Sequence, residues 1–269
     1  MAQTEKTKAK KQRQHGRYFW ISCITVGVIF AVWIIASAMG LLENNRVVPS
    51  IWAVGAALVD LCTSGYKGNT LLQHLGSSFF RLFTAFFLAV LTAVPFGLLS
   101  GMNEKVRAAM QPIIEFVRPL PPLAYYTVIV MWLGIGDGSK IMLLYMACFP
   151  PIYIACVASV SKIPEAYTHV AATLGASDRQ MFWKVILPYT TPDIFTGVRT
   201  AFGHGYMTLV AAEMVAASSG IGWVVLDASN WLRSDIIFAG IIVMGVTGLV
   251  FDWILRNLEK KAVPWKGKL

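Results

Sequence analysis

The chain has 269 residues, of which 56% are hydrophobic and only 14% are charged, with a formal net charge of +9. Soluble domains carry about 25% charged residues, so this composition predicts a protein of the lipid bilayer. The basic residues gather before the first apolar run and after the last, which is the flanking pattern that orients membrane proteins. We therefore expect contact with membrane lipid and not with nucleic acid.

The first part of the chain predicts a tail, a membrane helix and a segment outside the membrane. Residues 1–17 are rich in Lys and Gln and are expected to form a basic cytoplasmic tail. Residues 18–42 are a charge-free run, long enough to cross a bilayer core of about 30 Å as the first transmembrane helix. This run is too long for the core of a signal peptide, so we expect it to be retained. Residues 43–81 follow as a periplasmic segment.

A short apolar run lies inside that periplasmic segment. The stretch "VVPSIWAVGAALVDLC" (47–62) includes Pro49 near its start and Asp60 near its end. A seventh span at this place would scatter the basic residues over both sides of the membrane. We therefore predict an amphipathic helix that lies on the membrane surface.

Residues 82–255 carry five further apolar runs and are expected to form the core of the membrane domain. Because backbone polar groups must be satisfied internally in lipid, each run is predicted to be a helix. The runs are 82–102, a proline-broken stretch at 119–136, 141–161 with Pro150-Pro151, about 194–218 and about 236–255. Residues 256–269 form a second basic tail. The sequence thus predicts an all-α, polytopic membrane protein of about six spans with both termini in the cytoplasm.

The four cysteines give no sign of a metal site. Cys23, Cys62, Cys148 and Cys156 form no CxxC motif and no Cys/His cluster. Cysteines in such positions behave as small apolar packing residues.

A polar stretch, "HVAATLGASDRQMFWKVILP" (169–188), lies within the predicted cytoplasmic loop 162–193. Pro164 and Glu165 suit the first turn of a helix. Ala171, Ala172 and Gly175 then give that helix a smooth face, with Leu174 beside it, which suits insertion into a partner's groove. Ser177 and Asp178 are typical of the cap of a second helix, which Pro188 is expected to end. The alternative is an ordinary cytoplasmic loop with two short helices.

The order of residues in this stretch resembles the coupling-loop signature of binding-protein-dependent ABC importer permeases, E-A-A-x3-G-x9-I-x-L-P. Aligned on Gly175, Ala171 takes the second alanine position, Val185 takes the isoleucine position, and Leu187-Pro188 match. His169 and Val170 depart from the signature, because they stand at its glutamate and its first alanine.

Further stretches resemble the nitrate/sulfonate/taurine branch of these permeases, and within it the taurine-type subunits most closely. They are "RPLPPLAYYTVIVMWLGIGDGSK" (118–140), "TLVAAEMVAA" (208–217) with the Gly-Ile-Gly of 220–222, and "VPWKG" (263–267). The likeness covers about residues 71–267.

The resemblance implies the transmembrane domain of a type I ABC importer in a bacterial inner membrane. The implied partners are a second permease copy, two ABC ATPase subunits that bind ATP and Mg, and a periplasmic solute-binding protein. The resemblance implies that the chain itself holds no cofactor and catalyses no reaction. It has no Walker A pattern, so ATP is expected to be hydrolysed by the ATPase subunits. The implied solute is taurine or another alkanesulfonate, with nitrate, bicarbonate and a pyrimidine vitamin precursor as alternatives. The residues implied to contact the ATPase are Glu165, His169, Ala171, Ala172, Leu174, Gly175, Ala176, Ser177, Asp178, Leu187 and Pro188.

Polar residues inside the fifth predicted span form a stripe. Arg199, Tyr206 and Glu213 are spaced seven apart, and seven residues advance a helix to within 20° of two full turns. Ionisable groups within spans usually face a cavity or a partner. The stripe therefore either lines the path of the solute or fixes the packing of the helices.

Two other classes of protein compete with a transporter as explanations of the sequence. An intramembrane enzyme would use His204 and Glu213, but these fall on opposite faces of the predicted helix. His204 is flanked by Gly203 and Gly205, which predicts a close helix crossing instead. A membrane scaffold would not require the small-residue loop or the buried Arg and Glu.

Overall fold

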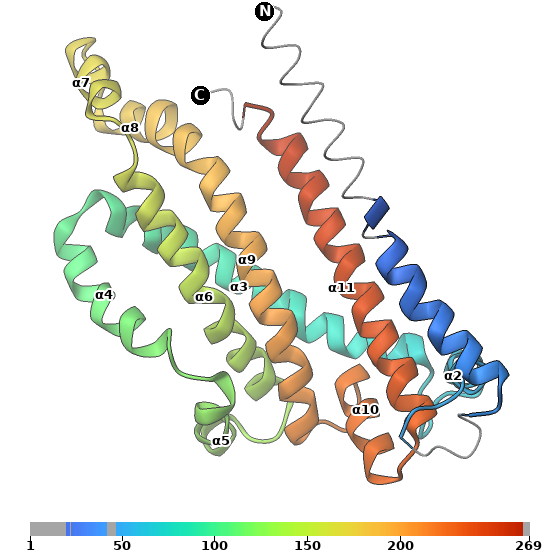
Figure 1. The fold of residues 1–269 in the computed structure, drawn as a ribbon. Helices are drawn as coiled ribbons and strands as arrows, with labels where there is room; N and C mark the ends of the chain where they lie inside the picture. Colours follow the sequence, from blue (N-terminus) through green and yellow to red (C-terminus); the bar gives the residue numbers. More distant parts are fainter. Residues whose placement is uncertain (1–19, 22, 42–46, 266–269) are drawn as a thin grey trace, which may run out of the picture.

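The computed structural model describes residues 20–41, except residue 22, and residues 47–265. The predicted tail 1–17 and residues 266–269 of the second tail lie outside the described residues. The rest is a set of helices joined by short loops (Figure 1). After the helix Cys23–Ala38 come α2 Ile51–Thr63, α3 Leu71–Met102, α4 Glu104–Val117, α5 Pro122–Leu133, α6 Asp137–Ser161, α7 Glu165–Thr173, α8 Asp178–Met181, the π-helical turn Phe182–Ile186, α9 Leu187–Ala216, α10 Ile221–Asn230 and α11 Ser234–Ala262.

The centre of the molecule is the packing of α3 and α9 against the two sides of α6. The main core cluster draws its buried residues chiefly from these three helices. Small residues dominate where α3 meets α6, among them Ala85, Ala89 and Ala93, all fully buried. Helices in a membrane associate through such close packing because lipid offers no hydrophobic driving force between them.

Two glycines show how close the approach is. A Cβ atom added at Gly97 of α3 would lie 2.6 Å from Cys156 Cβ of α6, and one at Gly205 of α9 would lie 2.5 Å from Cys148 Sγ. Both cysteines are fully buried. A larger residue at either glycine would force the helices apart.

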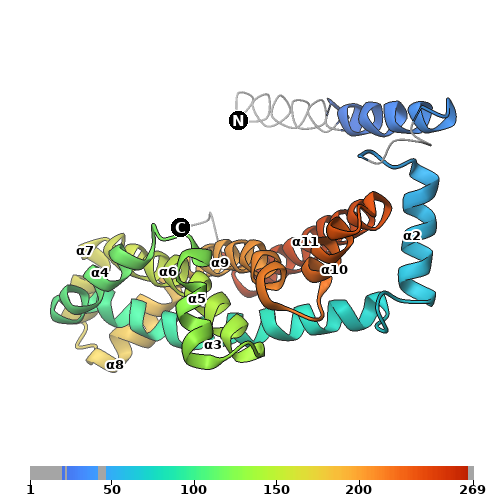
Figure 2. The ribbon, with the colours of Figure 1, turned by 90° about the horizontal axis from the view of Figure 1, so that it is seen from below.

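The remaining helices flank this centre. The α4–α5 pair lies along one side of it and α10 and α11 along the other (Figure 1). The helix Cys23–Ala38 contacts α11 through the rings of Trp33 and Phe238, 6.1 Å apart. Seen from below, α2 runs across the direction of α10 and α11 and joins the N-terminal helix to α3 (Figure 2). With 13 residues, α2 is shorter than the roughly 20 residues that a span needs.

Among the described helices, α3, α6 and α11 are each long and apolar enough to cross a membrane. The α4–α5 pair qualifies as a fourth, broken span, bent by 104°. The 30-residue α9 is long enough but carries more polar residues. The predicted number of six also counts residues 18–42, which are described only in part, so it stays a prediction.

Three boundaries differ from those that the charge pattern predicted. Helix α3 begins at Leu71 and α6 at Asp137, because Arg81 and Lys140 are buried inside the fold and do not mark its edge. Thr70 caps α3 through a capping box with Gln73. Residues 104–117, which lie between two of the predicted apolar runs, form α4 of the bent pair.

Candidate functional site

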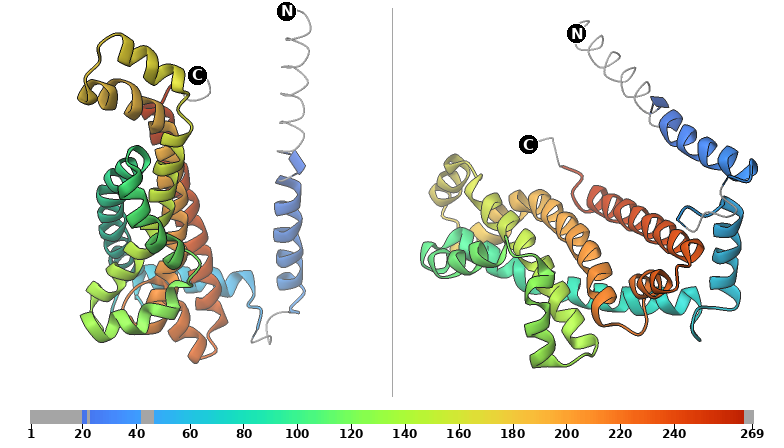
Figure 3. Two further views of the ribbon diagram at one scale, coloured as in Figure 1. Left: turned by 90° about the vertical axis from the view of Figure 1, so that its left-hand side faces the viewer. Right: turned by 60° about the horizontal axis from the view of Figure 1, so that its bottom comes forward.

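Helices α7 and α8 project from one end of the molecule, opposite the end that holds α5 and α10 (Figures 1 and 3). Pro164 is the N-cap of α7 and Glu165 lies in its first turn. Gly175 follows with φ of +77°, a left-handed conformation that turns the chain at little steric cost only in glycine. Ser177 then caps α8 through a capping box with Gln180, as its position in the sequence indicated.

The prediction that Pro188 ends this second helix is wrong. The chain continues from α8 through the π-helical turn into α9, and Pro188 lies within the first turn of α9. Pro has no backbone N–H to donate to the preceding turn. The π turn, in which Leu187 N donates to Phe182 O, brings the chain into α9 just before that missing donor.

The outer surface of the projecting helices is apolar. Leu174 is 82% exposed, Val170 60% and Trp183 59%. Val170 and Leu174, together with Ala171 and Val185, line a groove of about 700 Å³, and Trp265 lines it as well. Exposed apolar surface of this kind marks a contact site for a partner protein or for the membrane.

Some residues of the coupling-loop signature line this groove, and others are exposed outside it. Ala171 is half-buried in the groove, whereas Ala172 and Asp178 are exposed. His169 Nε2 lies 4.0 Å from Glu165 Oε2, and both side chains are exposed, so this pair contributes little to stability.

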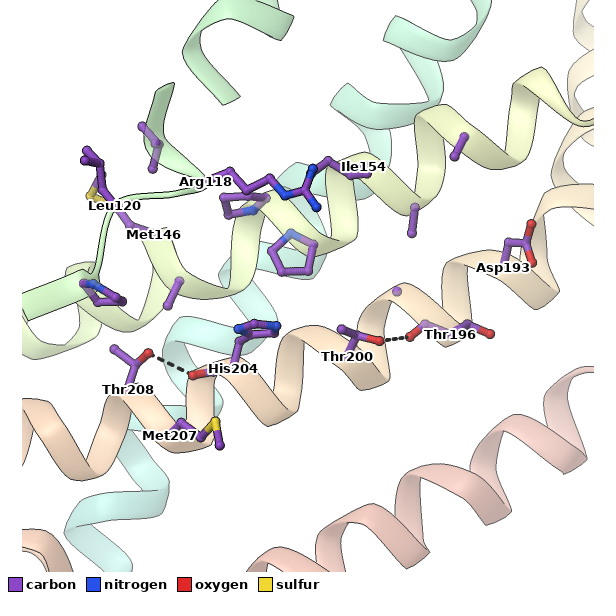
Figure 4. Close-up of a pocket in the computed structure, with 18 of the residues that line it drawn as sticks. Arg118, Leu120, Met146, Ile154, Asp193, Thr196, Thr200, His204, Met207 and Thr208 are labelled. Atoms are coloured by element: carbon purple, nitrogen blue, oxygen red, sulfur yellow. Dashed lines mark hydrogen bonds between the residues drawn. The ribbon is translucent and has the colours of Figure 1, made fainter. Parts of the chain in front are cut away.

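A second concave site, the α6–α9 cavity, lies between α6, α9 and the bend of the α4–α5 pair. Its volume is about 680 Å³. From α9 it receives the polar series Thr196, Thr200, His204 and Thr208, spaced four apart and so on one helix face. Figure 4 shows this series along one wall, with Arg118 on the other side, beside α6. The prediction that His204 occupies a close crossing does not hold, because Gly205 makes the crossing and His204 is exposed to the cavity.

The predicted stripe Arg199–Tyr206–Glu213 lies on other faces of α9. Arg199 Nε donates to Asp252 Oδ1 of α11 at 2.7 Å, and Tyr206 Oη donates to Met244 O of the same helix at 2.8 Å. Glu213 is fully buried. None of the three lines the α6–α9 cavity, so their contacts favour the helix-packing interpretation.

Glu213 belongs to a buried polar cluster that joins α3, α9 and the start of α10. Its Oε1 accepts hydrogen bonds from Ser78 Oγ at 2.7 Å and Arg81 Nη1 at 2.8 Å. Its Oε2 accepts from Gly222 N at 3.0 Å. Arg81 also pairs with Asp137 at the start of α6, at 2.7 Å. A buried ion pair needs such complete hydrogen bonding to offset its desolvation.

The sequence did not single out Arg81. Its one signal was a lone arginine directly before an apolar run, which is also typical of a membrane boundary. Its main partner lies 132 residues further along the chain.

A more exposed polar cluster lies beside it, outside the spanning helices. Lys67 Nζ lies 2.7 Å from Asp227 Oδ2 of α10, and Tyr66 Oη donates to the same oxygen at 2.7 Å. The hydrogen bond from Lys67 holds the pKa of Asp227 below its usual value. Burial, together with the bond to Asp227, raises the pKa of Tyr66 to about 12. Tyr66 therefore stays a donor throughout the physiological pH range.

Comparisons with known proteins match these features. Residues 93–263 match the family described as "Binding-protein-dependent transport system inner membrane component". The taurine transport system permease protein TauC of Escherichia coli is 38% identical over 94% of this chain and 92% of its own length. The putative aliphatic sulfonates transport permease SsuC of Bacillus subtilis is 29% identical over 99% and 95%. The nitrate import permease NrtB of Leptolyngbya laminosa is 30% identical over 74% and 73%.

The fold has a solved counterpart as well. An inward-facing structure of the MetNI methionine ABC transporter contains a chain that matches 72% of this chain and 95% of its own length, with a TM-score of 0.63 and 15% identity. The fold is therefore that of an ABC importer transmembrane domain, as predicted.

The matching family model and the identity to TauC together define the membrane subunit of a transporter. The chain belongs to the family of binding-protein-dependent transport system inner membrane components, the ABC importer permeases. It is thus a non-catalytic, multi-pass subunit of the inner membrane. The family implies an ATPase and a solute-binding protein as partners.

Proposed function

We propose that this chain is the permease of an importer for taurine or a closely related alkanesulfonate. The observation that carries the proposal is the 38% identity to a taurine permease over nearly the whole length of both chains. The putative sulfonate permease of B. subtilis is 29% identical. Nitrate is the second candidate, because a nitrate permease is 30% identical over three quarters of this chain.

The proposed working unit holds two copies of this permease, two ATPase subunits that bind ATP and Mg, and a periplasmic binding protein. The loop 162–193 would lie in the cytoplasm, where the ATPase binds the projecting helices α7 and α8. Leu174 and Val170 provide the apolar contact, and Gly175 and Ser177 fix the turn between the helices. Closure of the ATPase dimer would then tilt α6 and α9, which flank the loop, as rigid bodies.

The proposed translocation path is the α6–α9 cavity. Its lining combines the polar face of α9 with the proline-containing middle of α6. The contacts of Arg199, Tyr206 and Glu213 instead hold α9 against α11 and α3. We assign these three residues to packing in the conformation described here.

Both termini are proposed to lie in the cytoplasm, with residues 43–70 in the periplasm. The basic segments at the two ends support this orientation. A cysteine in place of Lys67 should react with an impermeant reagent from the periplasm, and one in place of Asp178 only from the cytoplasm. Labelling of residue 178 from outside would reverse the orientation.

Transport itself is tested with the complete importer in proteoliposomes. The permease should co-purify with an ATPase, and with the binding protein it should accumulate labelled taurine only when ATP is supplied. Nitrate should not accumulate at the same concentration. Accumulation of nitrate without taurine would move the chain to the second candidate, and failure to co-purify any ATPase would contradict the importer assignment.

A further inference from the structure

Arg118 occupies a special place at the bend between α4 and α5. It is the C-cap residue of α4 and lines the α6–α9 cavity together with Pro150, Pro151 and Thr200. The two prolines lie at the middle of α6, a helix that qualifies as a membrane span. The guanidinium of Arg118 thus faces the mid-section of a spanning helix (Figure 4).

Among the residues that the structure describes, Arg118 has no carboxylate partner. Arg81, Arg199, Arg233 and Arg256 each pair with an Asp or Glu, whereas Arg118 forms no such pair and its side chain is exposed to the cavity. A charged group at membrane depth is costly and is found where a cavity, a partner or a transported solute meets it. A guanidinium also presents a planar set of donors that suits an oxyanion.

The α6 wall of the cavity, beside Arg118, offers hydrogen-bond acceptors. Pro150 and Pro151 cannot donate to the carbonyls of Met146 and Ala147, four residues earlier, and all four residues line the cavity. These two carbonyls therefore lose their usual helical donors. On α9, Thr200 Oγ1 donates to Thr196 O at 2.9 Å. Its proton is thus used within the helix, while its oxygen keeps lone pairs that can accept a hydrogen bond.

From this arrangement we infer that the cavity binds a small zwitterion, with its anionic group at Arg118 and its ammonium group at the carbonyls of Met146 and Ala147. The inference rests on the proposed importer function and narrows its solute class to aminoalkanesulfonates. A plain anion such as nitrate or ethanesulfonate would contact Arg118 but would offer no donor to the two carbonyls. The permease would then add its own selection to that of the binding protein.

The test measures binding to the permease–ATPase complex in nanodiscs without the binding protein, by saturation-transfer NMR. Taurine is the zwitterionic probe, and ethanesulfonate lacks only the amine. The complete complex should bind taurine at least tenfold more tightly than ethanesulfonate. Equal binding of the two probes, or no binding of taurine, would overturn the inference.

Substitutions of Arg118 test its proposed contact with the anionic group of taurine. Arg118→Gln should weaken taurine binding at least tenfold, and Arg118→Lys should weaken it less. The control Lys105→Gln changes an exposed cation of the same helix outside the cavity and should leave binding unchanged. Unchanged taurine binding in Arg118→Gln would overturn the role of the arginine. These results are independent of transport, because ATP-driven uptake by the unmodified importer tests the proposed function separately.

The prolines are tested in the same way. The double variant Pro150→Ala/Pro151→Ala restores the backbone donors that cover the two carbonyls. Its taurine binding should fall toward that of ethanesulfonate, whose own binding should not change. Pro95→Ala, inside α3, is the matched control for a helix proline outside the cavity. An equal loss for both probes would show that the carbonyls do not contact the amine.

Discussion

Two faces of α9 carry polar residues, and they differ in whether those residues have partners within the chain. On one, Arg199 and Tyr206 find partners on α11, and Glu213 finds its partners on α3 and α10. On the other, Thr200 and His204 face the α6–α9 cavity with Arg118 across from them. Polar groups whose partners belong to the same chain hold the fold together, whereas those that face an open cavity are available to a solute. Sequence spacing shows which residues share a face but not which face has partners.

Substitutions on the face whose residues have partners within the chain should lower the stability of the fold, and the largest loss is expected at Glu213. Glu213→Ala removes the acceptor for Ser78, Arg81 and Gly222 in a buried site. Breaking a buried ion pair costs about 3–5 kcal/mol, so the variant should lose most of its folded protein on mild heating. Fluorescence-detected size-exclusion chromatography after a temperature series measures this.

Asp137→Asn is the matched control for Glu213→Ala. It removes the charge of the half-exposed partner of Arg81 and should lower the stability of the fold much less than Glu213→Ala does. If Glu213→Ala instead folds normally and loses only taurine uptake, Glu213 belongs to the translocation path. The proposed difference between the two faces of α9 would then be wrong.

The projecting helices extend the comparison to apolar residues, because Leu174 also lacks a cover within the described chain. Burial of a leucine side chain contributes about 1.5–3 kcal/mol, and about 1.4 kcal/mol is a factor of ten in affinity. Leu174→Asp should therefore weaken ATPase binding tenfold or more and leave the thermal stability of the permease unchanged. Co-purification of the ATPase is the measurement, with Thr173→Asp, at an exposed polar residue of α7 outside the groove, as control. Full association of Leu174→Asp would place the ATPase contact elsewhere.

Tyr206 tests the partnered face with a smaller change. Tyr206→Phe removes only the hydroxyl that donates to Met244 O, and such a bond contributes about 0.5–1.5 kcal/mol. Thermal stability should fall slightly, and the rate of taurine uptake at 25 °C should be unchanged. A large loss of uptake with unchanged stability would support the path interpretation of the stripe.

The smallest effect is expected at the outer cluster. Because the pKa of Asp227 is lowered by Lys67, the pair stabilises the fold above pH 4 and loses this contribution as the pH falls through the lowered pKa. Asp227→Asn should be less stable than the unmodified protein at pH 7, by about 1 kcal/mol or less for a partly exposed pair. This difference should vanish in acid. If the stability difference between Asp227→Asn and the unmodified protein instead grew as the pH fell, the assigned direction of the Asp227 pKa shift would be wrong.

The sequence was most informative where the structure depends on local patterns. Charge-free runs located the apolar helices, and Ser177 marked a cap because its partner Gln180 lies within one turn. The partnership of Arg81 with Glu213 could not be predicted, because the two residues lie on different helices far apart in the chain. Helix α4 was not predicted because its charged residues interrupt the apolar pattern, although the α4–α5 pair qualifies by length and composition as a broken span or a re-entrant loop. The cavity depends on that bend, so Arg118 could not be placed in it from the sequence.

The central claim, that the open face of α9 lines the solute path, is tested most directly by cysteine accessibility in the working importer. With Cys23 and Cys62 replaced by Ser, Thr200→Cys and Tyr206→Cys would each be treated with a charged, water-soluble thiol reagent. The claim predicts that Thr200→Cys reacts, that reaction blocks taurine uptake, and that taurine slows the reaction, while Tyr206→Cys stays unreactive. Rapid, taurine-protected reaction at residue 206 with none at residue 200 would contradict it.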